Sequence, residues 1–155
     1  MPAEAALPAG QEVRPAPLLT VERLSLRLKG AQANIVENVS FAVAPGETLC
    51  IVGESGCGKS VTALSLMGLL PMPPLELVSG VADFGGQDLL SLTPRQMSAI
   101  RGDRISMIFQ EPMTSLNPVY RVGDQVAEVV LRHRDVTRAE ARARAREMLE
   151  RVRIP

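Results

Sequence analysis

Aromatic residues are scarce in this 155-residue sequence, which has no tryptophan, one tyrosine and three phenylalanines. A hydrophobic core must therefore be built from leucine, valine, isoleucine, alanine and methionine. Hydrophobic residues nevertheless make up 46% of the chain and charged residues 22%, which is close to ordinary globular usage. A wholly disordered or fibrous chain is therefore not expected.

Cysteine and histidine are also rare, with only Cys50, Cys57 and His133. Two cysteines are too few for a disulfide scaffold, and no His/Cys cluster suggests zinc. No apolar run reaches the roughly 18 residues of a transmembrane helix. The N-terminus lacks the basic start and apolar block of a signal peptide. These absences favour a reducing, cytosolic compartment.

The chain also has no net charge, because its 17 basic and 17 acidic residues cancel. The total therefore gives no sign of a nucleic-acid or membrane-surface partner. Arginines crowd the C-terminal segment, where Asp135, Glu140, Glu147 and Glu150 offset only half of them. We interpret this arginine-rich stretch as a solvated helix face and expect no nucleic-acid partner.

The apolar pattern predicts an α/β protein. Residues 1–17 hold four prolines and are predicted to be a flexible tail, followed by one domain over 18–155. Alternation from Leu18 to Leu28 and from Ile35 to Val43 predicts two strands of an antiparallel layer. The continuous run Thr48 to Val52 predicts a strand buried on both faces, as in a parallel sheet. Further strands are expected at Gly80 to Phe84 and at Ile105 to Ile108.

Helix signals occur at four places. An apolar segment after Ser60 is helix-compatible and stops at Pro71. Thr93 with Gln96, and Thr137 with Glu140, each have the spacing of a capping box. The first of these helices is expected to end at Gly102, and another helix is expected from Asp124 to about Arg134.

The strongest motif fits the pattern G-x-x-x-x-G-K-[ST], between the predicted strand and helix, and reads Gly53-Glu54-Ser55-Gly56-Cys57-Gly58-Lys59-Ser60. Gly56 and Gly58 let the backbone curl so that successive N–H groups form an anion nest. The helix that follows adds unpaired amides and the positive end of its dipole. Lys59 supplies a mobile positive charge, and the Ser60 hydroxyl can bind Mg²⁺. We therefore predict that residues Gly53 to Val61 bind a nucleotide.

Cys57 allows two interpretations. Its place beside Lys59 at a helix N-terminus is a setting in which cysteines are often reactive. The motif leaves this position free, however, so Cys57 is more simply a contributor of backbone N–H.

A second segment narrows the interpretation, and it reads Gln110-Glu111-Pro112-Met113-Thr114-Ser115-Leu116-Asn117-Pro118. Together with Val52 to Ser60 it resembles the ATPases of ABC transporters, and within them the oligopeptide and dipeptide importers. The resemblance runs from about Leu18 to Pro155. It implies a P-loop NTPase fold of ABC type, here the N-terminal antiparallel β layer, the first part of the parallel-sheet core and the start of the helical subdomain.

The resemblance also implies roles and partners. Gln110 would help to bind Mg²⁺ and to position water at the γ-phosphate of ATP, although from spacing alone it is a solvated polar residue. About Met113 to Tyr120 would contact the transmembrane permease subunits. A second ATP-binding subunit would complete a homo- or heterodimer, on the cytoplasmic face of the membrane. The transported substrate would be a peptide or a related small solute.

Two departures from the family pattern stand out. Leu28 occupies the position where the family usually stacks adenine on an aromatic ring, so base preference is less secure. The signature sequence, the Walker B strand and the switch histidine are not found up to Pro155, and His133 does not match the last of these. We therefore expect a fragment of an ATPase, with Lys59 and Gln110 assisting chemistry that this chain alone does not complete.

Two other functions stay open from the motifs alone. The chain could be a P-loop phosphotransferase or kinase, with the C-terminal arginines as a lid, although residues 110–118 would then have no role. It could also be a non-catalytic module that keeps a nucleotide as a structural ligand.

Overall fold

The computed structural model describes residues 16–110 and 115–154. The chain divides into two units, Met1–Ser91 and Leu92–Pro155. The predicted N-terminal tail, residues 1–17, lies outside the described residues except for its last two. Within the described ranges, no helix is long and apolar enough to cross a membrane.

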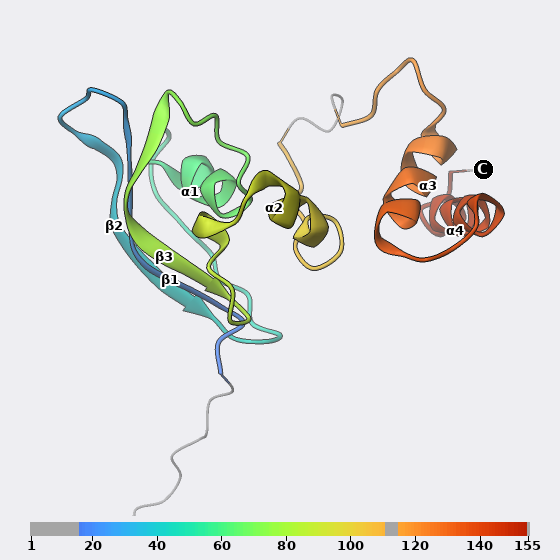
Figure 1. Cartoon of the computed structure of the whole chain (residues 1–155), viewed down its shortest axis with the longest axis horizontal. Coiled ribbons are helices and arrows are strands. Elements are labelled where there is room, and N and C mark those ends of the chain that lie inside the picture. The colour runs from blue at the N-terminus through green and yellow to red at the C-terminus, as the bar shows by residue number, and fades with distance from the viewer. Residues whose placement is uncertain (1–15, 111–114, 155) are drawn as a thin grey trace, which may run out of the picture. The chain divides into compact units, whose positions relative to one another are not determined.

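The first unit is built on an antiparallel sheet of three strands (Figure 1). These are β1 (Leu19–Leu28), β2 (Asn34–Val43) and β3 (Leu75–Phe84), in the order β2-β1-β3. The two predicted strands of the antiparallel layer are confirmed, and β1 pairs with β2 in the expected antiparallel sense. The third strand begins at Leu75, whereas the sequence predicted a start at Gly80.

A bulge in β1 sets which side chains are buried. Arg23 has a φ of 48°, and the register with β2 and β3 shifts at this point. The extra residue of a bulge moves the following side chains to the opposite face. Val21 and Leu24 are therefore both buried although they are three positions apart, and Leu26 continues the buried row. Each such leucine contributes about 2–3 kcal/mol through burial.

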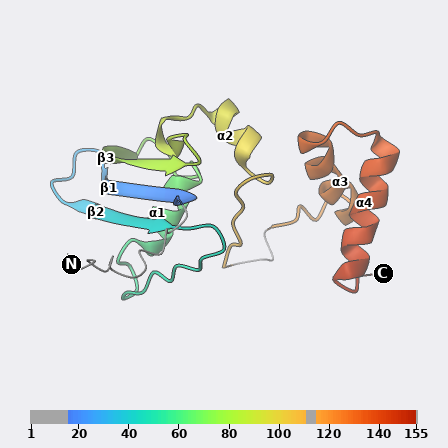
Figure 2. The same ribbon diagram turned by 90° about the horizontal axis from the view of Figure 1, so that it is seen from below.

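Helix α1 (Lys59–Leu66) lies on one side of the sheet in both views (Figures 1 and 2). Thr62, Ser65 and Leu66 are its buried residues. The two hydroxyls donate within the helix region, Thr62 Oγ1 to the Gly58 carbonyl at 3.0 Å and Ser65 Oγ to the Thr62 carbonyl at 2.7 Å. The short 3-10 helix η1 (Leu89–Ser91) follows β3.

Two predicted strands are absent from the described structure. Residues 48–52 form no strand, and Val52 is 87% exposed. Residues 105–108 likewise form no strand beyond an isolated bridge between Arg101 and Ile105, and Ile108 is 97% exposed. A strand persists only where its backbone groups are paired. Both sides of β1 are taken by β2 and β3, and no described strand runs beside either segment. These two predictions were wrong. An apolar run indicates residues that favour burial, but a strand also requires a neighbouring strand to pair with, and none is described here.

The second unit contains α2 (Pro94–Ile100), α3 (Val122–His133) and α4 (Arg138–Arg151). Both predicted capping boxes are confirmed, at Thr93 with Gln96 and at Thr137 with Glu140. Figures 1 and 2 show α3 beside α4. Alanines form most of their contact, because the buried cluster consists of Ala127, Val130, Ala141 and Ala145. Small side chains let the two helices approach closely, and the arginines of α4 stay exposed.

Gly80 gives a first testable prediction. Its φ is +118°, and a Cβ there would lie 2.6 Å from Leu24 Cα and 2.9 Å from Leu24 N. We expect Gly80→Ala to lower the free energy of unfolding by about 3 kcal/mol, combining left-handed strain with overlap against backbone. Gly30→Ala is the control, since Gly30 also has a positive φ but open space around it. Urea unfolding measures the free energy of unfolding of both variants. Equal losses of stability in Gly80→Ala and Gly30→Ala would contradict a steric effect of the close approach to Leu24.

Glu140 gives a second prediction. Hydrogen bonds from the backbone N–H and the hydroxyl of Thr137, both 2.8 Å from Oε2, hold the pKa of Glu140 below its ordinary value, and Arg144 adds to this. A depressed carboxyl pKa stabilises the fold at pH values above the unfolded-state pKa, and this contribution is lost as the pH falls through the folded-state pKa. Thr137→Val keeps the backbone donor, so the Glu140 pKa should rise part of the way when NMR follows its titration. The control Thr93→Val, in the other capping box, should leave the Glu140 pKa unchanged. A Glu140 pKa that does not change in Thr137→Val would show that the Thr137 hydroxyl does not lower it.

Candidate functional site

The phosphate loop, residues 53–60, connects the exposed segment 48–52 to α1. Gly56 and Gly58 have φ values of 84° and 90°, which favour glycine. A Cβ on Gly58 would also lie 3.0 Å from the Ile35 carbonyl oxygen and 3.1 Å from Val36 Cγ2. Gly58 therefore turns the chain into α1 directly against the start of β2, where no larger residue fits without displacement.

The ammonium group of Lys59 closes the loop upon itself. Its Nζ donates to the carbonyl oxygens of Gly53 at 2.8 Å and of Glu54 at 2.7 Å. The Cys57 Sγ lies 3.5 Å from the same nitrogen. The side chain thus bends back over the loop, so that its positive charge stands above the curled backbone. Carbonyl partners are neutral, and a multiply charged anion would compete effectively for this ammonium group.

The start of α1 adds further positive potential. Gly58 is the N-cap residue and has no side chain with which to cap the helix. The amide of Thr62 bonds to the Gly58 carbonyl at 2.8 Å, but in the described structure no acceptor is recorded for the amides of Lys59, Ser60 and Val61. Unpaired first-turn amides together with the helix dipole form an anion-binding arrangement. The predicted residues Gly53 to Val61 therefore form one continuous turn and helix start.

The two predicted Mg²⁺ ligands are placed differently. Ser60 is exposed beside Lys59, and its hydroxyl has no hydrogen bond among the described residues. Gln110 is also exposed, but it belongs to the second unit and immediately precedes residues outside the described range. The described residues contain no group of three or more His, Cys, Asp or Glu side chains that could hold a metal ion.

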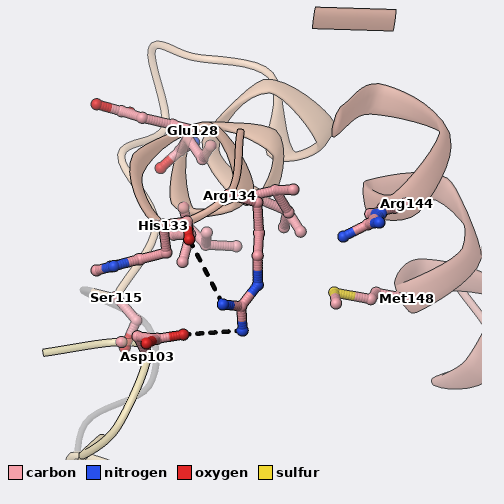
Figure 3. Close-up of a pocket in the computed structure, with 13 residues that line it drawn as sticks. Asp103, Ser115, Glu128, His133, Arg134, Arg144 and Met148 are labelled. Carbon is pink, nitrogen blue, oxygen red and sulfur yellow. Dashed lines mark hydrogen bonds and ion pairs between the residues drawn. The ribbon is translucent and has the colours of Figure 1, made fainter. Parts of the chain in front are cut away.

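A pocket of about 520 Å³ occupies the second unit (Figure 3). Leu116, Val126, Val129 and Met148 give it an apolar lining. At its edge, Arg134 Nη2 pairs with Asp103 Oδ1 at 2.8 Å and so ties the end of α3 to the loop after α2. The sequence did not predict this pocket, since its residues come from segments far apart in the chain.

Part of the predicted partner-binding segment borders this pocket. Of Met113 to Tyr120, the first two residues lie outside the described range, and Ser115 and Leu116 line the pocket. Gln125 holds the following turn, because its Oε1 accepts from the Asn117 amide at 2.9 Å and its Nε2 donates to the Asn117 and Tyr120 carbonyls at 2.9 and 3.1 Å. Tyr120 itself is exposed. The sequence analysis missed this role of Gln125, which only tertiary contacts reveal.

Comparison with known proteins gives one consistent family. Residues 36–155 match the family model described as ABC transporter. The chain is 52% identical over 139 residues to a probable peptide ABC transporter ATP-binding protein, y4tR, of Sinorhizobium fredii, covering 88% of this chain and 42% of that protein. It is 46% identical over 145 residues to the oligopeptide transport ATP-binding protein OppD of Bacillus subtilis, covering 92% of this chain and 40% of that protein. The chain thus spans about two fifths of the length of these relatives.

The fold has a solved counterpart. The ATP-binding cassette MJ0796, in a dimeric post-hydrolysis state bound to ADP and Pi, matches with a TM-score of 0.70 at 22% sequence identity. The match covers 85% of this chain and 56% of that chain. At this identity the likeness concerns the fold alone, and it confirms the predicted fold class.

The environment of Cys57 generates a third prediction. A Cβ on Gly53 would lie 2.7 Å from the Cys57 Sγ, so this exposed thiol lies directly against the Gly53 backbone. We expect alkylation of Cys57 with N-ethylmaleimide, in a Cys50→Ser chain, to weaken MgATP binding at least tenfold by bulk alone. The matched control is the Cys57→Ser chain alkylated at Cys50, which is also an exposed free thiol. Calorimetry after mass-spectrometric proof of complete alkylation is the measurement, and an unchanged affinity would refute the steric argument.

Proposed function

Because the chain belongs to the ABC transporter family, we propose that its phosphate loop binds the triphosphate of ATP together with Mg²⁺. The observation that carries the proposal is the Lys59 ammonium, which lies over the curled loop at the uncapped start of α1. Three to four negative charges on closely spaced oxygens complement this arrangement of one cation and several amides.

Binding exchanges one set of hydrogen bonds for another. Lys59 releases the carbonyls of Gly53 and Glu54 and turns to phosphate oxygens, which are the stronger acceptors because they are charged. The amides at the start of α1 donate to the same anion. Gly56, with open space where a Cβ would stand, leaves the backbone accessible to it. The loop can therefore receive the anion through rotation of one side chain and small backbone adjustments.

Mg²⁺ neutralises phosphate charge in the proposed complex. The Ser60 hydroxyl, exposed beside Lys59, is its protein ligand in the phosphate loop, and the phosphates and water supply further oxygens. Gln110 is proposed as a second oxygen ligand. Its amide oxygen suits a hard cation, and its NH₂ group can donate to water at the γ-phosphate.

The adenine contact is proposed to be apolar. Leu28 ends β1 and is 44% exposed, so it can cover one face of a base with its methyl groups. Contact of this kind is weaker and less selective than stacking on an aromatic ring. Discrimination between adenine and other bases is therefore expected to be modest.

The wider role follows from the relatives. We propose that residues 18–155 are part of an ABC ATP-binding domain in a subunit of an importer for peptides or related small solutes. Such a subunit works at the cytoplasmic face of a membrane with permease subunits and a second ATP-binding subunit. The permease contact is proposed at Met113 to Tyr120, supported by the exposed Val119 and Tyr120 and by the apolar pocket beside Leu116. ATP hydrolysis coupled to transport is proposed for the whole protein, with Lys59 and Gln110 assisting.

Lys59→Ala tests the nucleotide site directly. We expect it to weaken MgATP binding by tenfold to a hundredfold, because it removes the one mobile cation of the phosphate loop. The chain offers a control in Arg23, an exposed cation in the bulge of β1 for which no ion pair is recorded among the described residues. Arg23 is level with Val39 to Phe41 of β2, whereas the phosphate loop packs against Ile35 and Val36. Arg23→Gln should therefore leave the affinity within about twofold of the parent chain, a margin set by screening of distant exposed charges.

Isothermal titration calorimetry with ATP and excess Mg²⁺ measures these affinities. Urea unfolding of both variants shows whether the fold is retained. Equal affinities in the parent chain and a folded Lys59→Ala chain would overturn the proposed nucleotide site.

A further inference from the structure

A second pocket, of about 380 Å³, lies in the second unit between the start of α3 and the exposed side of α4. It is separate from the phosphate loop and from the pocket of Figure 3. Three arginines line it, together with two acids and two apolar side chains, namely Arg121, Arg142, Arg146, Asp124, Glu150, Leu149 and Ile154. Gly123 completes the lining with backbone alone.

The arginines of this pocket differ in their pairing. Arg142 is engaged by Asp124, with Nη2 to Oδ1 at 3.1 Å and Nε to Oδ1 at 3.2 Å. For the side chains of Arg121 and Arg146, no ion pair or hydrogen bond is recorded among residues 16–110 and 115–154. Arg142 and Arg146 stand one turn apart on α4, so their side chains project on the same side of the helix. Two guanidinium groups are therefore free to meet an anion beside a third that is already anchored.

Backbone donors lie in the same pocket. Arg121 is the N-cap of α3 and its side chain does not cap the helix. The first α3 amides that bond within the helix start are those of Asp124 and Gln125, both to the Arg121 carbonyl. Val122 and Gly123 are in the first turn, where amides have no intrahelical acceptor. A Cβ on Gly123 would meet nothing within 4 Å, so a ligand can approach its N–H closely.

Two apolar side chains, Leu149 and Ile154, also line the pocket. Arg153 has a φ of 62°, and the Ile154 amide bonds back to the Leu149 carbonyl at 2.9 Å. This helix-ending turn brings Ile154 next to Leu149 at the pocket, where Ile154 stays 49% exposed. The pocket thus combines guanidinium groups with the apolar side chains of Leu149 and Ile154, and it also holds the Glu150 carboxylate. Cations and apolar side chains in one pocket are the features of a site for a ligand with both characters.

We propose that this pocket binds a phosphate group, held by Arg121 and Arg146 and by the first amides of α3, with the organic part of the ligand against Leu149 and Ile154. Guanidinium groups match the planar, two-oxygen face of a phosphate. The ligand is either a small soluble phosphate ester or the headgroup of an anionic phospholipid. The pocket is proposed in addition to the nucleotide site and does not depend on it.

Inorganic phosphate tests the site in the full chain. Because the phosphate loop also attracts this anion, the readout is residue-specific: NMR shifts of the Gly123 amide and of the arginine Nε–H groups. We expect saturable shifts at these positions in the parent chain and equally in a Lys59→Ala chain, in which the phosphate loop is impaired. If phosphate-induced shifts are lost only at residues 56–60, the result concerns the proposed nucleotide site and does not contradict the site at Arg121 and Arg146.

Charge removal supplies the matched comparison. The double variant Arg121→Gln/Arg146→Gln should weaken phosphate binding at Gly123 at least tenfold. Arg132→Gln/Arg144→Gln removes the same charge from positions that do not line this pocket and should leave binding within about twofold, as expected for screened distant charges. Equal weakening in both double variants, or no saturable shift at Gly123 in the parent chain, would overturn the site.

Vesicle sedimentation separates the two ligand sources. Vesicles of phosphatidylcholine with one third phosphatidylglycerol are compared with pure phosphatidylcholine vesicles. Binding to the anionic vesicles that is lost in Arg121→Gln/Arg146→Gln but retained in the control identifies a lipid headgroup. Phosphate binding in NMR without such vesicle binding identifies a soluble phosphate ester.

Discussion

The approach of Gly58 to the start of β2 is the constraint on which the phosphate loop depends. A Cβ at this position would lie 3.0 Å from the Ile35 carbonyl oxygen, and the φ of 90° also favours glycine, so a larger residue would have to displace the start of β2. This approach fixes where α1 begins, and the beginning of α1 fixes the direction of its unpaired amides. Lys59 is the next residue, so the mobile cation is attached at the same point. The close contact of Gly58 with the start of β2 thus positions both the first amides of α1 and the attachment point of the Lys59 side chain.

In the second unit, small side chains allow two helices, α3 and α4, to pack closely. Ala141 and Ala145 are buried on α4 and meet Ala127 of α3, so the arginine-rich α4 can pack against α3 without large apolar side chains. Residues before α3 are tied to it by Gln125, and residues after α2 by the pair of Arg134 and Asp103. Polar side chains therefore organise the loops, while small side chains organise the helices.

Local signals in the sequence predicted most of the elements. Alternating apolar residues identified β1 and β2, the capping boxes identified α2 and α4, and the glycine pattern identified the turn that leads into α1. Features that depend on residues far apart could not be predicted in this way. The strand predicted at 48–52 lacks a described neighbour, and the pockets beside Leu116 and Arg121 each combine several segments. The bulge at Arg23 was missed because its register shift is set by strand pairing.

The unpaired segment 48–52 runs without interruption into Gly53, whose carbonyl holds Lys59. Any polypeptide segment that aligns beside residues 48–52 as a strand would restrict the loop that follows them. Thermodynamic linkage requires any such coupling to be reciprocal: if ordering of this strand changed affinity at the loop, an occupied loop would change the pairing of the strand by the same free energy. The junction at residues 52 and 53 is the place in the chain where sheet assembly and ligand binding would be coupled.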